Sequence, residues 1–466
     1  MAKDKIRGNE LLKLGVPQGR AISLLLEVLG KYYKREKKNK KIEIVKAVLK
    51  QPEKFVNDEV FSVFVKELLS PKAKHREVVL RTKRLGYAVF GATEIEQGAM
   101  HQMEVATKLP IALKAALMPD AHHGYGLPIG GVLATESAVI PYGVGVDIGC
   151  RMCMTIYNMP ENYLARHRQN LKQHLLDHTR FGGGTGFKKP TDDPIFERKE
   201  FKEIGIVSKQ KDKAYIQIGS SGSGNHFVEF GEVEILVEDN EWGLPLGKYL
   251  GILSHSGSRA LGANIARYFT QLAMANCKLP NEAKHLAWLD LNTEAGQEYW
   301  LAMNLAGDYA SACHHQIHKK LAKAMGEKPI AQIENHHNFA WKEQIEGKEM
   351  IVHRKGATPA GKGVLGIIPG SMVTPGFIVR GKGAVTALNS ASHGAGRLMS
   401  RKQAKETINK KDWQQLLKKH NVNLIGGGLD EAPAAYKNIH TVMEAQRELV
   451  EVLGTFYPKI VRMDGA

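Results

Sequence analysis

The sequence is organised around Gly143-Val144-Gly145-Val146-Asp147-Ile148-Gly149-Cys150, an apolar run that is broken by glycines and contains a carboxylate and a thiol. Glycines at this density let the backbone turn tightly and approach a ligand closely. Asp147 offers a hard oxygen and Cys150 a soft sulfur, a mixture that suits a borderline divalent metal such as Mn²⁺, Zn²⁺ or Fe²⁺. We therefore expect histidines from later segments to complete one metal centre that handles phosphate chemistry.

The composition is that of a globular protein with an excess of positive charge. Hydrophobic residues make up 43% of the 466 residues and charged residues 24%. This length allows two or three domains, or one large domain with an appendage. The formal net charge of +17 favours a polyanionic partner, with nucleic acid as the first candidate. Basicity that serves solubility alone is the alternative.

Targeting signals and cysteine usage bear on the compartment. No apolar run is long enough to span a bilayer, and the first ten residues do not have the pattern of a secretory signal. Four cysteines in a chain of this length do not indicate a disulfide scaffold. We expect a cytoplasmic protein that does not associate with membranes.

Residues 1–85 are expected to form a small, basic helical domain or arm. Apolar residues recur with helical spacing at 22–29 and 42–49, and a third helix is expected at 61–69. The basic run from Lys31 to Lys41 lies between the first two and includes two tyrosines. Such a run could contact a phosphate backbone while the tyrosines stack on bases. A solvated helix end and loop explains the same residues almost as well.

From about residue 86 onward, strand-like apolar pieces alternate with glycine-rich turns. Asp120 and His122 could orient ligands or bind substrate, although a turn-stabilising aspartate and a packed histidine are the plain alternatives. Cys150 and Cys153 have C-x-x-C spacing, but no second such pair follows. We interpret them as one ligand thiol and one packing thiol. An amphipathic helix and a polar loop are expected over 161–212.

Several later segments deliver histidines to glycine-rich or serine-rich loops. A short strand at 216–218 is expected to lead into a loop whose amides can cradle phosphate oxygens, followed by His226. A strand at 249–253 then delivers His255, and Arg259 could grip a phosphate in a fork geometry. Residues 260–325 are expected to be mainly helical, and we interpret the histidines at 314–318 as satisfied or surface groups.

The C-terminal part repeats the pattern. One of His336 and His337 should be a ligand. Arg354 and Lys355 follow a strand and could clamp phosphate, with a solvated strand end as the alternative. His393 stands beside two glycines and an arginine, a setting in which a histidine is exposed to a ligand more often than buried. After 403 we expect a polar helix, a glycine turn, a helix near 440–453 and a final strand.

Taken together, these segments resemble the RNA-splicing ligase RtcB family from about residue 86 to the C-terminus. The ordered motifs are MPDAHHGYGLPIGG (118–131), VGVDIGC (144–150), SGNHFVE (223–229), SHSGSR (254–259), HHN (336–338), RKGA (354–357), PGSM (369–372) and SHGAGR (392–397). Each motif alone is weak evidence, but the ordered set is specific. The resemblance implies an α/β (α+β) fold with central β-sheets around a deep two-metal site over 86–466, with the helical extension at 1–85 added.

The resemblance also implies an activity. The family joins RNA ends that bear a 3′-phosphate or 2′,3′-cyclic phosphate to 5′-hydroxyl ends, in RNA repair or tRNA splicing, with GTP and two Mn²⁺ ions. The implied nucleophile is His393, which would become guanylylated. The implied metal ligands are Asp147, Cys150, His226, His255 and His337. The implied guanylate-binding positions are Asn225, His226, Phe227, Val228, Glu229, His337, Asn338, Pro369, Gly370, Ser371, Met372, His393, Gly394, Ala395 and Gly396.

The chain departs from the family pattern at three places. Arg151 stands where a glycine usually follows the metal-binding cysteine, and Gly376 stands where a serine is usual. The end, residues 462–466, lacks the usual terminal Lys-Gly, whose lysine touches the guanine. With the N-terminal extension, these differences indicate a divergent paralogue. The RNA, the acceptance of DNA ends, an activating protein partner and the oligomeric state are left open.

Two other functions are compatible with the same residues. A metal-dependent RNA-end phosphatase or cyclic phosphodiesterase on this scaffold is favoured by Gly376 and by the missing terminal lysine. A non-catalytic RNA-binding factor is favoured by the net charge and the N-terminal arm. The retained nucleophile and metal-ligand set argues against the second alternative, because binding alone needs neither.

Overall fold

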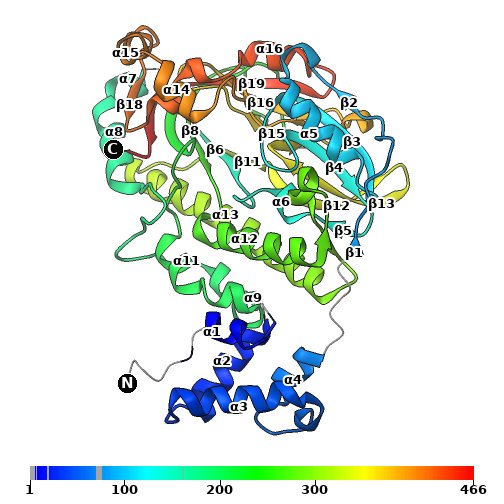
Figure 1. The fold of residues 1–466 in the computed structure, drawn as a ribbon. Helices are drawn as coiled ribbons and strands as arrows, with labels where there is room; N and C mark the ends of the chain where they lie inside the picture. Colours follow the sequence, from blue (N-terminus) through cyan, green and yellow to red (C-terminus); the bar gives the residue numbers. More distant parts are fainter. Residues whose placement is uncertain (1–5, 7, 18–19, 70–75, 161, 466) are drawn as a thin grey trace. The chain divides into compact units, whose positions relative to one another are not determined.

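The chain divides into two compact units, residues 1–76 and residues 77–466, in the computed structural model (Figure 1). The structure describes residues 6, 8–17, 20–69, 76–160 and 162–465. Among these residues, no helix is both long enough and apolar enough to cross a bilayer.

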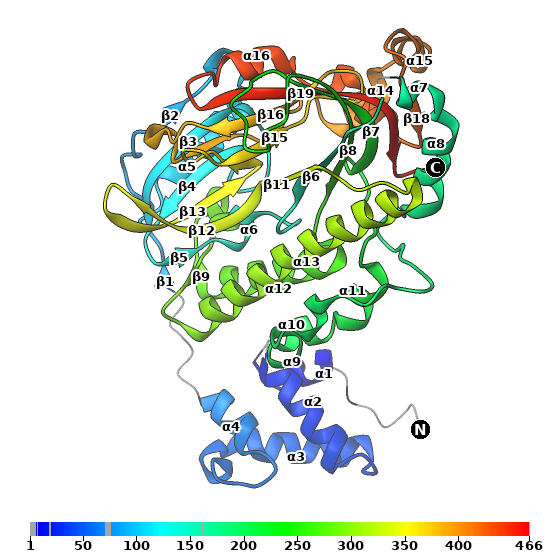
Figure 2. The same cartoon turned by 180° about the vertical axis from the view of Figure 1, so that it is seen from behind.

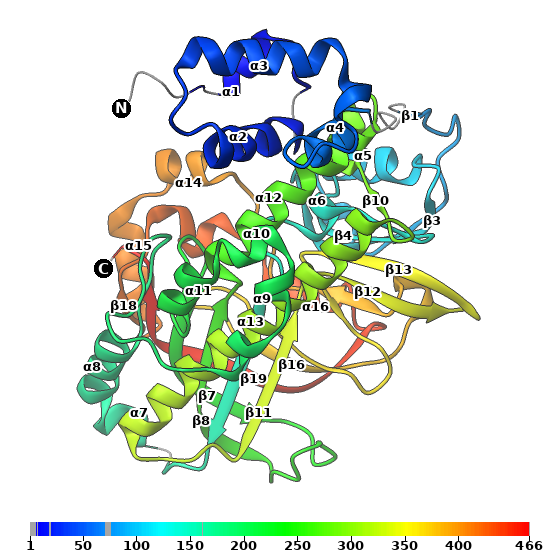
Figure 3. The same ribbon diagram turned by 90° about the horizontal axis from the view of Figure 1, so that it is seen from below.

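The N-terminal unit is helical and is drawn in blue in Figure 3. Its helices are α1 (Gly8–Lys13), α2 (Arg20–Tyr32), α3 (Lys38–Lys50) and α4 (Ser62–Leu69), with a 3-10 turn, η1 (Pro52–Phe55), before α4. Apolar side chains from α2, α3 and α4, among them Leu25, Val45 and Phe64, meet in one core. The helices expected at 22–29, 42–49 and 61–69 are therefore present.

The second unit contains a large sheet with the strand order β11-β6-β8-β7-β19-β16-β15. Neighbours in this order pair antiparallel, and β18 pairs parallel with β19. The strands are β6 (Arg151–Tyr157), β7 (Phe227–Ile235), β8 (Gly247–Ser256), β11 (Ala331–His336), β15 (Leu365–Ile368), β16 (Gly376–Gly381), β18 (Asn423–Ile425) and β19 (Val450–Met463).

Another sheet has the order β12-β13-β4-β3-β2, and short strand pairs link the loops between the sheets. Its strands are β2 (Ala88–Val89), β3 (Ala112–His122), β4 (Ile129–Thr135), β12 (Asn338–Ile345) and β13 (Lys348–Lys355). The short pairs join β5 (Ala138–Val139) to β10 (Leu289–Asp290) and β14 (Ala357–Pro359) to β17 (Ser390–Ser392). The expectation of an α/β (α+β) fold with central β-sheets is confirmed.

Two long helices, α12 (Arg259–Asn276) and α13 (Glu294–Met325), lie side by side along one face of the sheets (Figures 1 and 2). Their apolar faces form a core with α6 and with β12. The remaining helices are α5 (Gln97–Thr107), α6 (Pro141–Val144), α7 (Tyr163–Arg166), α8 (Arg168–His178), α9 (Glu200–Glu203), α10 (Gly205–Ser208), α11 (Lys211–Gln217), α14 (Arg401–Thr407), α15 (Lys410–Lys419) and α16 (Ile439–Glu444).

Local expectations from the sequence were wrong at two places. The strand expected at 216–218 is the end of α11, in which Ala214 and Gln217 are buried at helical spacing while Ile216 is exposed. The helix expected near 440–453 ends at Glu444, and β19 begins at Val450 because that segment pairs with both β7 and β16. Tertiary pairing outweighs helix propensity there.

Candidate metal centre and catalytic site

Four neighbouring strands of the large sheet bring the candidate metal ligands to one edge. Cys150 precedes β6, His226 precedes β7, His255 lies near the end of β8, and His337 follows β11. Because adjacent strands run antiparallel, the starts of β6 and β7 and the ends of β8 and β11 meet at this edge. The register pairs Met152 with His255, which sets Cys150 beside that histidine.

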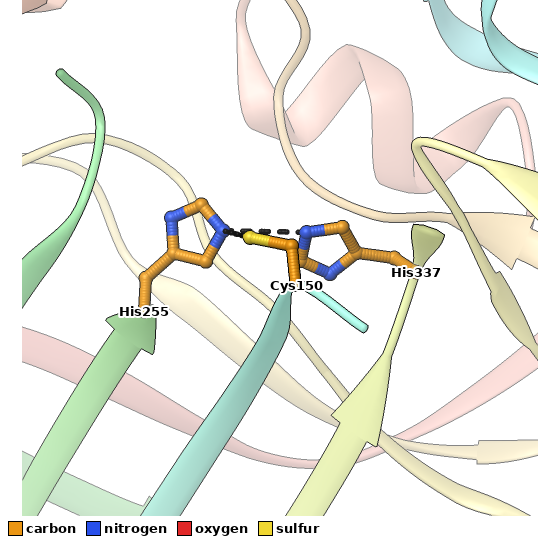
Figure 4. A group of neighbouring side chains, drawn as sticks. All are labelled: Cys150, His255 and His337. Carbon is orange, nitrogen blue, oxygen red and sulfur yellow. Dashed lines mark hydrogen bonds between the residues drawn. The ribbon is translucent and has the colours of Figure 1, made fainter. Parts of the chain in front are cut away.

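Figure 4 shows the side chains of Cys150, His255 and His337 pointing toward one another. The Sγ atom of Cys150 lies 3.2 Å from Nε2 of His255 and 3.5 Å from Nε2 of His226. The Nε2 atoms of His255 and His337 are 3.3 Å apart. Such close approach of donor atoms is the geometry of ligands around a cation.

Asp147 extends the cluster on the side of His226. Its Oδ2 atom lies 3.0 Å from Nε2 of His226, and its Oδ1 atom accepts a hydrogen bond of 3.1 Å from the backbone amide of Ser258. Among the described residues, the groupings Asp147–Cys150–His226 and Cys150–His255–His337 each have the compactness of a metal site, and they share Cys150. The sulfur of Cys150 is therefore within reach of a cation held by either grouping.

The protonation states fit metal binding. His255 donates its Nδ1 proton to the carbonyl oxygen of Asn225 (3.0 Å), so its Nε2 lone pair faces the cluster. Burial and the neighbouring His226 lower the pKa of His255 to about 3. Burial and His393 hold the pKa of His337 well below its usual range. Both rings are therefore neutral near pH 7, as imidazole ligands must be.

Cys150 behaves differently. Burial, and then the negative charge of Asp147, raise the pKa of its thiol well above the usual value. A dication would reverse this effect, because a coordinating thiol is deprotonated. Together with the lone pair of His255 that faces the cluster, this donor set fits a metal site.

His393 stands beside the cluster and is held by a carboxylate. Its ring centroid lies 5.0 Å from that of His337. The completely buried Asp120 accepts hydrogen bonds from both Nδ1 (2.6 Å) and the backbone amide (3.0 Å) of His393 through Oδ2. Burial alone would raise the pKa of Asp120, but the charge and hydrogen bond of His393 outweigh it and lower the pKa. Asp120 therefore orients His393, whereas the sequence interpretation was that it orients ligands or binds substrate.

The cluster and His393 line one cavity of about 390 Å³. The lining includes every metal-ligand candidate and, of the guanylate candidates, Asn225, His226, Phe227, Glu229, His337, Asn338, Pro369, Gly370, Ser371, Met372, His393, Gly394, Ala395 and Gly396. Val228 does not line it, because its side chain alternates to the opposite face of β7 and is fully buried there. His122 also lines the cavity, and burial lowers its pKa to about 4.

The two basic residues at the end of β13 point in different directions: one side chain lines the cavity and the other is buried inside the fold. Lys355 lines the cavity, donates to the carbonyl oxygen of Tyr125 (2.5 Å), and has its pKa lowered to about 7 by burial. Arg354 is fully buried, pairs with Glu343 and donates to the carbonyl oxygen of Leu388 (2.8 Å). The expectation that Arg354 clamps phosphate is wrong, because its side chain points to the other face of the strand and is used inside the fold.

Other arginines near the motifs also differ from expectation. Arg259 donates to the carbonyl oxygen of Gly182 (2.6 Å) and to the hydroxyl of Ser220 (3.1 Å), and it does not line the cavity. Arg397 and Arg401 do line it, beside Glu431 and Tyr436, although the sequence interpretation gave these four no role. The sequence feature that could have predicted this is the spacing of four residues between the two arginines, directly after the glycines at 394 and 396.

Cys153, His314 and His318 form a separate buried group of potential metal ligands. His314 donates from Nε2 to the carbonyl oxygen of Ser256 (3.2 Å), and its Nδ1 accepts from the hydroxyl of Ser254 (2.6 Å). His318 lies 2.8 Å from Ser254 through Nε2 and 2.8 Å from Thr155 through Nδ1. Every ring nitrogen is thus hydrogen-bonded, which favours the satisfied-histidine interpretation.

The departures from the family pattern have visible structural roles. Arg151 is buried, pairs with Glu334 (3.0 Å) and donates to the carbonyl oxygen of Gly307 (2.9 Å) in α13. Arg151 therefore connects the segment that follows Cys150 to the long helix α13. Gly376 and Met463 line the cavity, whereas Arg462 points to Phe181, with 5.6 Å from its guanidinium carbon to the ring centroid.

The fold and the cluster define an α/β protein in which a buried group of one thiol and several imidazoles, able to hold a metal ion, lies next to an oriented histidine. A family model described as "tRNA-splicing ligase RtcB" matches residues 102–464. The RNA-splicing ligase RtcB of Escherichia coli (strain K12) is 35% identical over 392 residues, which cover 78% of this chain and 93% of that protein.

Archaeal proteins are similar over nearly the same span. The tRNA-splicing ligase RtcB of Archaeoglobus fulgidus is 31% identical and is matched over 74% of this chain and 86% of its own length. That of Methanococcus maripaludis is 30% identical, over 75% and 88%. The chain belongs to the RtcB family of RNA-splicing ligases, and this membership identifies it as an RNA ligase.

Proposed function

We propose that the protein joins RNA 3′-phosphate or 2′,3′-cyclic phosphate ends to 5′-hydroxyl ends, with GTP and Mn²⁺, through a guanylate on His393. The observation that carries the proposal is the position of His393, with its ring 5.0 Å from that of His337 and its Nδ1 bonded to Asp120. A histidine that serves only packing needs neither a buried carboxylate partner nor an opening toward a metal-binding cluster.

In the proposed site, Asp147, Cys150, His226, His255 and His337 hold two Mn²⁺ ions. When bound, such ions neutralise charge on the attacking and leaving oxygens of a phosphoryl transfer. The protein supplies neutral imidazoles at His255 and His337, and its thiol at Cys150 loses its proton on metal binding. Cys150, His255 and His337 are buried, and their low-dielectric surroundings strengthen electrostatic interactions with a bound cation.

The nucleophile is the Nε2 lone pair of His393. Because Asp120 accepts the proton on Nδ1, Nε2 is the ring nitrogen that is left for attack on a phosphorus atom. Attack on the α-phosphorus of GTP forms a nitrogen–phosphorus bond and releases pyrophosphate. A 2′,3′-cyclic phosphate end is first hydrolysed by water to a 3′-phosphate. An oxygen of the 3′-phosphate then takes the guanylate from His393, which breaks the nitrogen–phosphorus bond. The 5′-hydroxyl finally displaces GMP, with loss of its proton, to form the phosphodiester.

The guanylate is proposed to lie against residues 225–227, 229, 369–372 and 394–396 of the cavity wall. Glu229 offers a carboxyl group whose pKa is raised well above its usual value by burial. A Cβ at Gly394 would lie 3.3 Å from the carbonyl oxygen of Pro369, so glycine lets these two loops of the cavity wall approach closely. The buried, unpaired cysteines are consistent with a cytoplasmic location, which we also propose.

Covalent labelling tests this proposal. The protein is incubated with GTP labelled at the α-phosphate and Mn²⁺, without RNA, and protein-bound GMP is assayed for acid lability. We expect label on the wild-type chain and none on His393→Ala, with metal content retained in the variant. Label that persists in His393→Ala would overturn the nucleophile assignment.

A second assay separates ligation from the alternative of an RNA-end phosphatase or cyclic phosphodiesterase. A cleaved stem-loop with a 2′,3′-cyclic phosphate and a 5′-hydroxyl is supplied with GTP or ATP. Ligation that depends on GTP supports the proposal. Release of phosphate without joining, together with absence of labelled protein, favours the alternative, for which Gly376 at the cavity wall is the supporting observation.

A further inference from the structure

Most of the excess positive charge belongs to the N-terminal unit. Residues 1–76 contain 19 Lys and Arg against 9 Asp and Glu, a net charge of +10. The other 390 residues carry only +7. A charge so concentrated is not explained by the candidate active site, every residue of which lies in the second unit. It is the electrostatic footprint expected of a polyanion-binding surface.

Within this unit, some basic side chains are buried or form ion pairs, and others are exposed and form none. Lys38 forms an ion pair with Glu10 (2.5 Å), and Lys41 is buried. Among the described residues of this unit, nine exposed basic side chains form no ion pair: Lys13, Lys31, Lys34, Arg35, Lys37, Lys46, Lys50, Lys54 and Lys66. Five of these lie in the connection between α2 and α3 or on α3, and we call these five the basic surface: Lys34, Arg35, Lys37, Lys46 and Lys50. The surface thus consists of cations that the fold of the unit does not use.

The placement of charge on α3 opposes the stability of that helix. Helix N-termini favour carboxylates, because the backbone dipole is positive there. The first turn of α3 has no acidic residue, its N-cap residue Lys37 makes no side-chain cap, and Lys38, Lys40 and Lys41 follow directly. A cluster of cations at the positive end of a helix is compensated when an anion binds beside it.

An aromatic side chain accompanies the basic surface. Tyr32 is 50% exposed, and Lys31 extends over its ring at 5.0 Å from the centroid. Tyr33 is unavailable for a ligand, because its ring stacks on Phe61 at a centroid distance of 5.8 Å inside the unit. The sequence suggested two tyrosines for base stacking, and in the structure only Tyr32 of these two is accessible to a base.

We propose that the basic surface binds the phosphate backbone of single-stranded RNA, with Tyr32 stacking on a base. Lys46 and Lys50 lie on one exposed face of α3, about 6 Å apart along its axis, so that one strand can contact both. The contact is independent of base sequence and holds RNA outside the catalytic cavity. The RNA identity rests on the proposed function, but the binding surface does not depend on guanylylation.

Single-stranded RNA fits this surface better than a lipid bilayer does. An interfacial helix inserts large apolar side chains opposite its charged face. The exposed side of α3 carries Lys40, Glu43, Lys46, Ala47 and Lys50 and no large apolar residue. Cations combined with one aromatic platform are the combination used for unpaired nucleotides.

Charge neutralisation in the full chain tests the proposal. The test variant replaces Lys34, Arg35, Lys37, Lys46 and Lys50 by glutamine. The matched control loses the same charge at exposed lysines of the second unit that do not line the cavity: Lys202, Lys209, Lys278, Lys323 and Lys328. Affinity for a fluorescent RNA of about 20 nucleotides with a 3′-phosphate is measured over a series of salt concentrations.

The expected result is a loss of affinity of about tenfold or more at moderate salt in the test variant. The slope of log affinity against log salt should also become shallower, by up to about 3.5 for five lost phosphate contacts on a single strand. The control should change much less in both respects. An equal effect of the two variants on RNA would overturn the proposal, as would a selective loss of binding to vesicles containing anionic lipid.

Two further measurements keep this inference separate from the proposed function. Labelling of His393 by GTP without RNA should be equal in the wild type and the test variant, since the basic surface takes no part in it. Tyr32→Ala should weaken RNA binding at every salt concentration without changing the slope, and Tyr32→Phe should restore it. A wild-type Kd in Tyr32→Ala would overturn the stacking contact. If the wild-type chain is not labelled by GTP but still binds RNA more tightly than the test variant, the proposed function is contradicted and the RNA-binding surface is not.

Discussion

At the scale of single residues, the tautomer of His393 depends on Asp120. The carboxylate is completely buried and accepts two hydrogen bonds from His393. A carboxylate can only accept, so it holds the proton on Nδ1 and leaves Nε2 free. The reactivity that we propose for His393 is therefore set by a residue that does not line the cavity.

Asp120→Asn should slow transfer of GMP from GTP to the protein by about 100-fold or more, because the new amide can donate to Nδ1 and stabilise the wrong tautomer. Single-turnover labelling with GTP measures the rate. Metal content, determined in parallel, should match that of the wild type. Labelling at the normal rate would show that Asp120 does not control the reactive nitrogen.

Cys150→Ala should lose metal from both groupings, because the sulfur is the atom that they share. The metal-to-protein ratio after dialysis against Mn²⁺ measures this loss, and covalent GMP should disappear with it. Cys153→Ala is the matched control, since this thiol is also buried but belongs to the hydrogen-bonded group around His314. Normal metal content in Cys150→Ala would contradict the bridging role.

At the scale of elements, the turn between β8 and α12 shapes the metal site. The backbone of Gly257 lies directly against the carboxylate of Asp147, so that a Cβ at this position would overlap both carboxylate oxygens. The amide of the next residue, Ser258, donates to the same carboxylate. The turn therefore fixes a ligand that arrives from more than 100 residues earlier in the sequence.

Gly257→Ala should displace Asp147 and weaken Mn²⁺ binding by about 10- to 100-fold, the usual effect of disturbing the groups that orient a metal ligand. Calorimetric titration with Mn²⁺ gives the dissociation constant. Gly183→Ala is the control, because nothing lies within 4 Å of the position that its Cβ would take. Equal affinities in the two variants would show that the turn does not position Asp147.

At the scale of the whole molecule, the second unit buries neutral histidines far from its surface. Burial and the neighbouring His315 lower the pKa of His318 to about 3, and burial lowers that of His353 to about 4. Unfolding returns both rings to water, where the pKa is near 6.5. Below that pH the unfolded chain binds protons that the folded chain does not, so folding stability falls as the pH falls.

The metal-free protein should therefore unfold at progressively lower temperature between pH 6.5 and pH 4. Each such histidine contributes a slope of about 1.4 kcal/mol per pH unit in that window. Differential scanning calorimetry in the presence of a chelator measures the midpoint across a buffer series. A midpoint that stays constant from pH 7 to pH 4 would contradict burial of these rings in the neutral state.

The division of the chain also belongs to this scale. The compact units meet at residue 76, and the family match begins at residue 102. The helical unit thus lies outside the region that defines the family. We expected the boundary near residue 85, and the extent of a domain that folds alone stays a prediction.

The sequence by itself determined the family, the candidate ligands and the existence of most helices and strands. This was achievable because ordered glycine-rich motifs and apolar periodicity are local properties of the chain. Prediction from the sequence failed where contacts with residues distant in the chain decide the secondary structure or the direction of a side chain. The sequence predicted that Arg354 clamps phosphate, but its side chain pairs with Glu343 inside the fold. The sequence also predicted a helix up to residue 453, but residues from 450 onward pair with β7 and β16.

Only the tertiary structure decided that Cys150, His226, His255 and His337 share one edge of a sheet, and that Asp120 reaches His393 from 273 positions away. Strand order and register join segments separated by tens to hundreds of residues, and no local pattern encodes which strands become neighbours. The sequence motifs identify which side chains of this protein can bind a metal or react. The antiparallel packing of four strands sets the distances at which those groups act.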